Sequence, residues 1–192
     1  MATSPSRTRR FGRVEYERLI EAGVFKPDEP IELIGGVLAV AEPQGSAHFT
    51  TIRLVEEALR AAFGPGWDVR VQGPIALDDE SEPEPDVAVV PGTARDYRDA
   101  HPARPVLVVE VAESSLASDR EDKGSLYARA GLTEYWIVNL VDRRLEVYRE
   151  PVPGASAPFG WRYRSMQVLG PESSVAPLAA PTAFVCVSDL LP

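Results

Sequence analysis

Apolar and polar residues alternate along the chain in short blocks that turn-forming residues separate. Helix-capping residues, glycine stops and one apolar stripe (Ile52, Val55, Leu59 and Ala62) predict helices over residues 14–22, 46–63 and 118–130. Short apolar runs bounded by Gly, Pro or Asp predict the strands. These strands cover residues 31–34, 37–40, 67–72, 86–90, 106–112, 134–139, 145–149 and 161–168. This mixture predicts an α/β fold, a mixed sheet flanked by helices.

Turn residues add detail at both ends of the chain. Gly35 and Gly36 between two apolar runs predict a hairpin near the N-terminus. Ser118 and Glu121 have the spacing of a capping box, which predicts a helix start at Ser118. Residues 150–160 are rich in Pro, Gly and Ala and are interpreted as a surface loop. The C-terminal tail is expected to dock through the apolar residues Val185, Leu190 and Leu191.

Length and composition favour one domain in a reducing compartment. With 192 residues, no internal repeat and no long linker, residues 13–192 are expected to form one domain, and residues 1–12 a flexible arm. The single cysteine, Cys186, favours a cytoplasmic protein. The basic N-terminus has no apolar stretch behind it, which argues against a secretory signal. The net charge of −9 argues against nucleic-acid binding, because affinity for phosphates comes mostly from Lys and Arg.

Glu110 is the most informative residue. It interrupts the apolar run 106–112, whose composition predicts burial on both faces of a sheet. A buried carboxylate must be paired, protonated or bound to a cation. Either Glu110 pairs with an arginine or lies at the wet end of its strand, or it is a metal ligand.

Asp86 favours the interpretation of Glu110 as a metal ligand. Alone, it is simply the polar end of an acidic loop. Together with Glu110 on an adjacent strand, it offers two oxygen ligands to one ion, and Mg²⁺ takes one or two protein carboxylates. The sequence therefore predicts a site for Mg²⁺ or Mn²⁺ formed by Asp86 and Glu110.

Lys123 is the candidate for a catalytic cation. A helix that packs back along the sheet brings Lys123 level with Glu110, since five residues from Ser118 span about 7.5 Å. The alternative is a lysine on a solvated helix surface. Arg120, three residues earlier and so on nearly the same face, is its competitor and is expected to act as a phosphate clamp.

Three segments resemble the Uma-two family of restriction-endonuclease-like proteins, a branch of the PD-(D/E)XK nuclease superfamily. They are Glu-Pro-Asp-Val-Ala-Val-Val at 84–90, Leu-Val-Val-Glu-Val-Ala-Glu-Ser-Ser at 107–115, and the segment 122–138 that begins Asp-Lys-Gly-Ser-Leu-Tyr. The segments at 31–38 and 46–48 fit the same family, so the resemblance covers about residues 14–190.

The resemblance implies a restriction-endonuclease-like core with added N-terminal and C-terminal hairpins, and a site in which Asp86 and Glu110 match the metal-binding acids. Where the superfamily lysine stands, two residues after Glu110, this chain has Ala112, and Lys123 resembles a migrated replacement. Family-like positions also make His48, Glu32 and Tyr127 auxiliary candidates, each with an ordinary structural alternative.

The sequence is compatible with two functions. The preferred one is a Mg²⁺- or Mn²⁺-dependent endonuclease that acts on DNA, with double-stranded DNA as the expected partner. The alternative is an inactive nuclease-fold protein that serves as a binding or assembly module, which Ala112 and the acidic composition favour. The aromatic residues Tyr135, Trp136 and Tyr148 in the strand pair 134–139 and 145–149 predict a homodimer interface.

Overall fold

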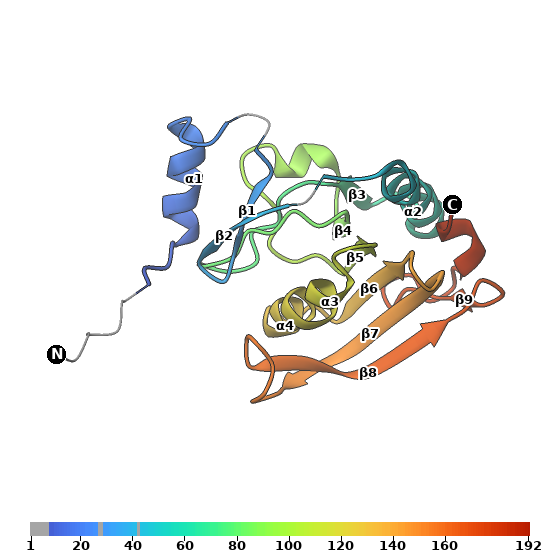
Figure 1. Ribbon diagram of the computed structural model, residues 1–192. Helices are drawn as coiled ribbons and strands as arrows, with labels where there is room; N and C mark the ends of the chain where they lie inside the picture. Colours follow the sequence, from blue (N-terminus) through green and yellow to red (C-terminus); the bar gives the residue numbers. More distant parts are fainter. Residues whose placement is uncertain (1–7, 27–28, 42) are drawn as a thin grey trace.

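The computed structural model describes residues 8–26, 29–41 and 43–192. Its centre is a six-stranded mixed sheet with the strand order β3-β4-β5-β6-β7-β8 (Figure 1). The strands are β3 (Trp67–Val71), β4 (Val87–Pro91), β5 (Leu107–Ala112), β6 (Glu134–Asn139), β7 (Arg144–Pro153) and β8 (Trp161–Leu169). The pair β5 and β6 is parallel, and the other neighbours are antiparallel. The fold is thus the predicted mixed sheet with flanking helices.

The remaining elements surround this sheet. Two small antiparallel sheets are formed by β1 (Ile31–Ile34) with β2 (Val37–Val40) and by β9 (Ser174–Val175) with β10 (Val185–Cys186). The helical segments are α1 (Arg13–Glu21), α2 (Ser46–Phe63), α3 (Leu116–Ser118), the π-helical η2 (Asp119–Lys123), α4 (Gly124–Arg129) and the 3₁₀ turns η1 (Ala94–Tyr97) and η3 (Val187–Leu190). The small sheets match the expected terminal hairpins. Within the described ranges, no helix combines the length and apolarity that crossing a membrane requires.

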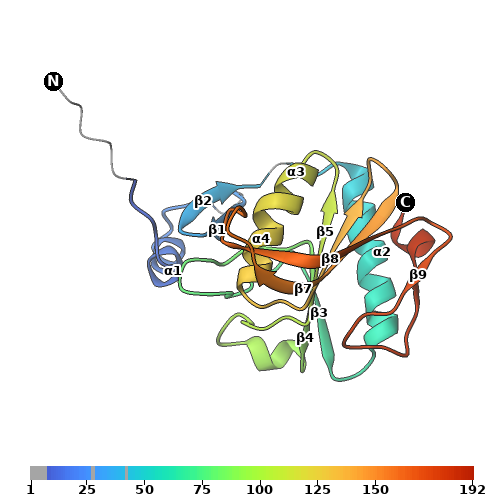
Figure 2. The ribbon, with the colours of Figure 1, turned by 90° about the horizontal axis from the view of Figure 1, so that it is seen from below.

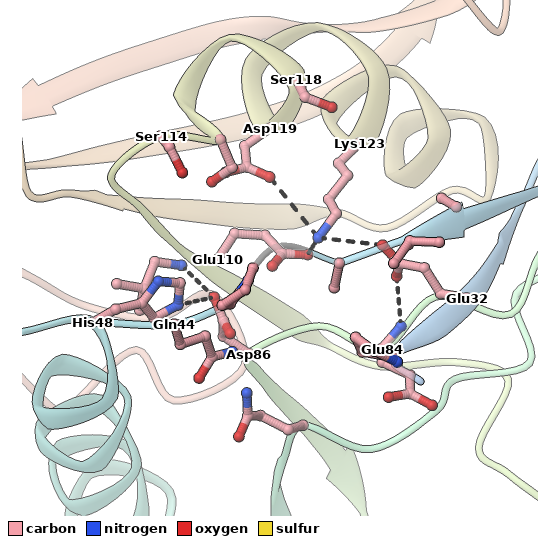
Figure 3. Close-up of a pocket in the computed structure, with 18 of the residues that line it drawn as sticks. Glu32, Gln44, His48, Glu84, Asp86, Glu110, Ser114, Ser118, Asp119 and Lys123 are labelled. Carbon is pink, nitrogen blue, oxygen red and sulfur yellow. Dashed lines mark hydrogen bonds and ion pairs between the residues drawn. The ribbon is translucent and has the colours of Figure 1, made fainter. Parts of the chain in front are cut away.

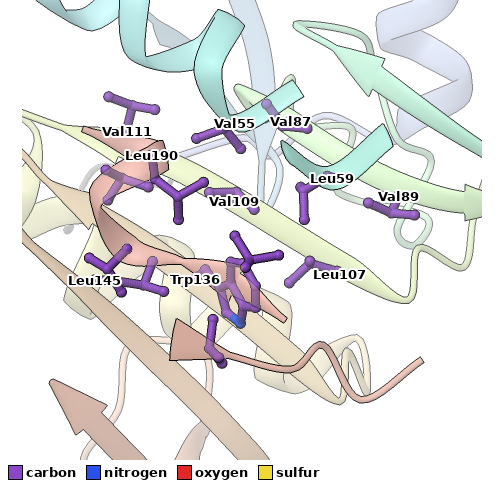
Figure 4. Packing of buried hydrophobic residues seen from close by; sticks show 14 of the residues in the cluster. Val55, Leu59, Val87, Val89, Leu107, Val109, Val111, Trp136, Leu145 and Leu190 are labelled. Atoms are coloured by element: carbon purple, nitrogen blue, oxygen red, sulfur yellow. The ribbon is translucent and has the colours of Figure 1, made fainter. Parts of the chain in front are cut away.

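Side-chain alternation along the strands creates two different faces. The odd-numbered residues of β5, such as Val109, pack with α2 and the C-terminal segment in the larger apolar cluster (Figure 4). The even-numbered residues Val108 and Ala112 belong to a second cluster with Tyr127 of α4. The helices α2 and α4 accordingly lie on opposite sides of the sheet (Figure 2). Because Glu110 shares the even positions, it faces the α3–α4 side.

The helix before β6 begins earlier than predicted. Ser115, and not Ser118, precedes the first helical residue, Leu116, and the Asp119 N–H donates to the Ser115 carbonyl at 2.9 Å. Ser118 therefore lies inside the helix, so the capping-box interpretation is wrong. Likewise Ser46, which the sequence favours as the N-cap of α2, is the first helical residue, and Gly45 is the N-cap. Both errors have one cause: a serine is as compatible with the first helical turn as with the cap.

The hairpin β7–β8 is longer than predicted. Residues 150–153, interpreted as loop because of their prolines, continue β7, and Pro151 pairs with Tyr163. The pairing of β7 with β6 ends at Arg149. Beyond this point β7 has a neighbour on one side only, and a strand with an open edge tolerates proline.

The aromatic residues expected at a dimer interface belong to the core. Tyr135 and Trp136 are completely buried, and Tyr148 is half-buried. Strand β6 is central, with β5 on one side and β7 on the other, so the strand pair is no edge hairpin. The interface argument is therefore wrong, and the homodimer itself stays a prediction.

Most of the expected N-terminal arm, residues 1–7, lies outside the described residues. Of the part that is described, Arg10 donates to the Gly35 carbonyl at 2.8 Å, and the Phe11 N–H donates to the Gly36 carbonyl at 2.9 Å. Residues 10 and 11 thus contact the turn of the β1–β2 hairpin. At the other end of the chain, Val185, Leu190 and Leu191 are buried, as predicted.

Candidate active site

A cavity of about 720 Å³ opens between the β1–β2 hairpin, the first turn of α2 and the α3–η2 helix (Figure 3). The beginning of β4 and the end of β5 form its floor. Five acidic residues line the cavity, namely Glu32, Glu84, Asp86, Glu110 and Asp119. Lys123 and His48 also line it. The predicted acids, the lysine and two of the auxiliary candidates therefore meet in one place.

Sheet topology brings Asp86 and Glu110 together. Strands β4 and β5 are antiparallel, and Val87 pairs with Val109. Asp86 and Glu110 follow one residue beyond that pair, on the face that α3 and α4 cover. Both carboxylates are buried, at 7% and 2% exposure, and both reach the cavity. The two residues thus lie on neighbouring strands and on one face, as expected, and their sharing of one ion stays a prediction.

Asp86 contacts a backbone N–H and the side chain of His48. Its Oδ2 accepts a hydrogen bond from the Val111 backbone N–H at 2.8 Å and lies 3.2 Å from His48 Nε2. His48 comes from the first turn of α2, so this contact joins the helix to the floor of the cavity. The two contacts fix the orientation of the Asp86 carboxylate in the cavity.

Glu110 sits between a tyrosine and a lysine. Its Oε1 accepts a hydrogen bond from the Tyr127 hydroxyl at 2.7 Å and lies 3.1 Å from Lys123 Nζ. Burial raises the pKa of Glu110 to about 8, the Lys123 ammonium opposes that shift, and the charge of Asp86 adds to it. A carboxyl group in this setting gains by binding a cation, because a cation offsets the cost of its buried charge.

Lys123 is surrounded by carboxylates. In addition to Glu110, its Nζ lies 3.9 Å from both Glu32 Oε1 and Asp119 Oδ1 (Figure 3). Burial lowers the pKa of Lys123, but the neighbouring acids outweigh burial and hold this pKa above its usual value. The lysine therefore remains protonated through the neutral range. It can act as a cation beside Glu110.

The helix that carries Lys123 is π-helical from Asp119 to Lys123. Single π-helical turns are rare and occur frequently at functional sites. Asp119 at the start of this turn is 2% exposed and accepts a hydrogen bond from the Ser115 hydroxyl at 2.6 Å. Burial raises the pKa of Asp119, and Lys123 lowers it.

Sequence reasoning missed two acids of the cavity, Asp119 and Glu84. Asp119 stands four residues before Lys123, a spacing that puts both on one helix face, and this signal could have found it. Glu84 lies two residues before Asp86, and its backbone N–H donates to Glu32 Oε2 at 3.0 Å. Burial raises the pKa of Glu84, and the charge of Glu32 adds to that effect.

Arg120 does not line the cavity. Its guanidinium forms two hydrogen bonds to the buried carboxylate of Glu146 on β7, with Nε 3.0 Å from Oε2. Asn139 and Tyr148 donate to the same carboxylate at 2.9 and 2.7 Å. Arg120 thus ties the π-helical turn to the sheet, and the expectation that it shares the face of Lys123 is wrong.

Ala112 lies in a buried, apolar part of the sheet. It is completely buried in the second apolar cluster, two residues beyond Glu110 on the same face. Lys123 reaches Glu110 from the helix above. The ammonium therefore approaches Glu110 by a route that leaves the buried end of β5 apolar.

The donor set fits a hard divalent cation. Asp86 and Glu110 supply carboxylate oxygens, and five acidic side chains face one lysine across the cavity. In the described part of the chain, no three His, Cys, Asp or Glu side chains form a ready-made ligand cluster. Mg²⁺ suits such a site, since it commonly takes one or two carboxylates and keeps water or phosphate oxygens as its other ligands.

Comparison with known proteins gives matches to solved structures and a match to a family model. The crystal structure of "a putative nuclease belonging to DUF820" from Anabaena variabilis aligns with a TM-score of 0.65 and 17% sequence identity, over 90% of this chain and 96% of that one. At this identity the likeness concerns the fold. The curated proteins gave no match. A family model, Uma2, described as "Putative restriction endonuclease", matches residues 13–186. The chain therefore belongs to the Uma2 family of nuclease-like proteins.

Proposed function

We propose that this protein is a Mg²⁺- or Mn²⁺-dependent endonuclease that hydrolyses phosphodiester bonds in DNA. The observation that carries the proposal is the meeting of Asp86 and Glu110 from adjacent strands, with Lys123 Nζ 3.1 Å from Glu110 Oε1. Membership of the Uma2 family supports the same function. The metal, the DNA substrate and the roles of the three residues are parts of this proposal.

Asp86 and Glu110 are the residues that would hold the ion. Bound there, a divalent cation supplies Lewis-acid polarisation of the phosphate and a water of lowered pKa. The Val111 N–H and His48 fix the Asp86 carboxylate, and the Tyr127 hydroxyl fixes that of Glu110. These contacts limit the rotamers of both acids before substrate arrives.

Lys123 supplies the positive charge beside the acids. Its ammonium stays protonated because carboxylates surround it, so it can orient a water molecule by hydrogen bonding and stabilise negative charge on the phosphate. Asp119 and Glu32, each 3.9 Å from Nζ, restrict where this charge can move.

Calorimetric titration with Mg²⁺ and with Mn²⁺, followed by single-turnover cleavage, tests the proposal. Wild type is expected to bind the ion and cut DNA. Glu110→Gln should weaken metal affinity at least about tenfold and remove cleavage, since one of two carboxylate ligands is lost. The matched control is Glu113→Gln, an exposed glutamate three residues away that does not line the cavity. Metal binding and cleavage by Glu110→Gln at wild-type levels would contradict the proposal.

The alternative function is a binding or assembly module without catalysis. Ala112 at the superfamily lysine position is the observation that favours it, together with a net charge of −9. The two functions differ in outcome: a binding module would hold nucleic acid or a partner protein without cutting any DNA in the presence of either metal.

A further inference from the structure

The cavity has two chemically different walls. The β1–β2 hairpin and the segments that flank it present an aliphatic wall, which consists of Pro30, Ile31, Ala39, Val40, Ala41 and Pro43. Strand β5, the segment before β4 and the π-helical turn η2 contribute the other four carboxylates and Lys123, and Glu32 is the one acid that the hairpin contributes. Val40 is 64% exposed, which is a cost for an apolar side chain that nothing covers. A ligand that fills this cavity therefore has a charged part and an apolar part.

A nucleotide has both parts. Its phosphate is anionic, and its base has apolar faces. We propose that the cavity holds one unpaired nucleotide of a nucleic-acid strand, with the phosphate toward Glu110 and Lys123 and the base against the aliphatic wall. The proposal rests on the proposed function, because the position of the phosphate follows from the metal site. It replaces the expectation of a continuous duplex as the bound form.

The recessed position of the acids argues against a continuous duplex. Glu110 is 2% exposed and Asp86 7% exposed, so a scissile phosphate must enter the cavity to reach them. In a duplex the bases are stacked and paired inside the helix, and the backbone offers only sugars and phosphates to a protein. An unpaired nucleotide can enter with its base, and about 720 Å³ lies within the range of 300–1,000 Å³ that is typical of small-molecule pockets.

The charge of the cavity argues the same way. Of the described residues that line it, Lys123 alone is a lysine or arginine, and five are acidic. Phosphate contacts by cationic side chains supply most of the affinity of proteins that grip duplex DNA. Without them, contact of the base with the aliphatic wall must supply a larger share of the affinity.

Gln72 adds a polar group that can contact the base edge. It lines the cavity, and its backbone N–H donates to the Asp86 carbonyl at 3.0 Å. Its φ of 47° is left-handed, a conformation that costs a non-glycine residue energy and that occurs at functional sites when the surroundings enforce it. The amide of Gln44 reaches the same cavity beside His48 (Figure 3). Primary amides both donate and accept, as hydrogen bonding to a base requires.

Binding of three fluorescent probes separates base contact from phosphate contact. The probes are a 12-nucleotide oligothymidylate, the same length of strand with abasic sites at its centre, and a 12-base-pair duplex. Fluorescence anisotropy is read with Mg²⁺ directly after mixing. The wild-type protein should bind the single strand at least about tenfold more tightly than either other probe. Equal affinity for all three, or no binding of any, would overturn the inference.

A substitution in the aliphatic wall tests its contact with the base directly. Val40→Ser removes apolar surface without changing charge, and it should weaken binding of the oligothymidylate about fivefold while leaving the abasic strand unaffected. The matched control is Val37→Ser on the same strand, since Val37 is 54% exposed and does not line the cavity. An unchanged affinity of Val40→Ser for the oligothymidylate would contradict the role of the wall.

Cleavage of the same probes distinguishes the two proposals. If duplex and single strand are cut equally fast and Val40→Ser changes neither rate, the nucleotide pocket is refuted and the nuclease stands. If no probe is cut with Mg²⁺ or Mn²⁺ but binding still depends on the bases and on Val40, the nuclease is refuted and the nucleotide pocket stands.

Discussion

Lys123 contacts more members of the acid cluster than any other single side chain described in the cavity. Its Nζ lies 3.1 Å from Glu110 and 3.9 Å from Asp119 and from Glu32, so it neutralises part of a strongly negative cavity. The same ammonium competes with a metal ion for the carboxylate oxygens of Glu110. A lysine at this position thus has two opposite effects: it assists the phosphate chemistry and it weakens metal binding.

Lys123→Met should separate these effects. The substitution keeps the length of the side chain and removes its charge. Cleavage is expected to fall at least about 100-fold, in keeping with the loss of one preorganised electrostatic group, while Mg²⁺ affinity stays equal or increases. Single-turnover cleavage and calorimetric titration measure the two quantities. Lys26→Met, which replaces an exposed lysine that does not line the cavity, is the control. A parallel loss of cleavage and metal affinity would show that Lys123 mainly supports the fold of the site.

At the scale of elements, the sheet was more predictable than the helix above it. Apolar runs such as 106–112 predict buried strands directly, because a strand buried on both faces needs apolar residues at nearly every position. The π-helical turn from Asp119 to Lys123 depends on tertiary contacts, among them the ion pair of Arg120 with Glu146 on β7. A polar segment of this kind gives no local signal for a π-helical turn. Lys123 could therefore be proposed from sequence, and its four-residue spacing could have added Asp119, whereas the orientation of Arg120 could not be predicted.

The packing of α1 on the loop before β4 shows an element-scale dependence on pH. Glu82 in that loop is 2% exposed and lies 3.9 Å from Arg13 of α1. Burial raises the pKa of Glu82 from 4.5 to about 7, and the carboxylate of Glu17 on α1 adds to the shift. Since the folded state holds this proton more tightly than the unfolded state, the contribution to stability is complete below pH 4.5. It is lost as the pH rises through about 7.

Glu82→Gln should remove this dependence. Between pH 4.5 and 8, the free energy of unfolding of the wild type is expected to fall relative to that of the variant, by about 1–3 kcal/mol. Urea denaturation of both proteins across this range measures the difference. Glu80→Gln, an exposed glutamate in the same loop, should follow the wild type. A constant difference between wild type and Glu82→Gln at all pH values would refute the assignment.

At the scale of the whole molecule, the two faces of the sheet carry different groups. The α3–α4 face carries the acids and Lys123, and the α2 face is closed by the C-terminal segment. Glu134 of β6 fixes that segment: its Oε2 accepts the Leu178 N–H at 2.7 Å, and Arg149, which pairs with Glu134, donates to the Ala176 carbonyl at 2.8 Å. The docking of the tail could be predicted from its apolar residues, but this polar anchor could not, because its two hydrogen bonds to the tail join positions 27 and 44 residues apart.

Substitution of Leu190 tests whether the last turn of the chain belongs to the core. The family match ends at residue 186, yet Leu190 is completely buried in the larger cluster with Trp136 and Leu145 (Figure 4). Leu190→Ala should therefore lower the free energy of unfolding by about 2–5 kcal/mol, the range for a buried leucine. Leu178→Ala is the matched control in the same segment. Its side chain is 48% exposed, so a change below about 1 kcal/mol is expected.

Urea denaturation measures both variants, and calorimetry with Mg²⁺ is carried out on the folded proteins. Because Leu190 packs on the face opposite the acids, metal affinity should remain at the wild-type level while stability falls. Equal stability of Leu190→Ala and Leu178→Ala would mean that the tail packs on the sheet without supporting it. A loss of metal affinity in folded Leu190→Ala would mean that the two faces are coupled through β5, whose odd-numbered residues contact the larger cluster and whose even-numbered residues include Glu110.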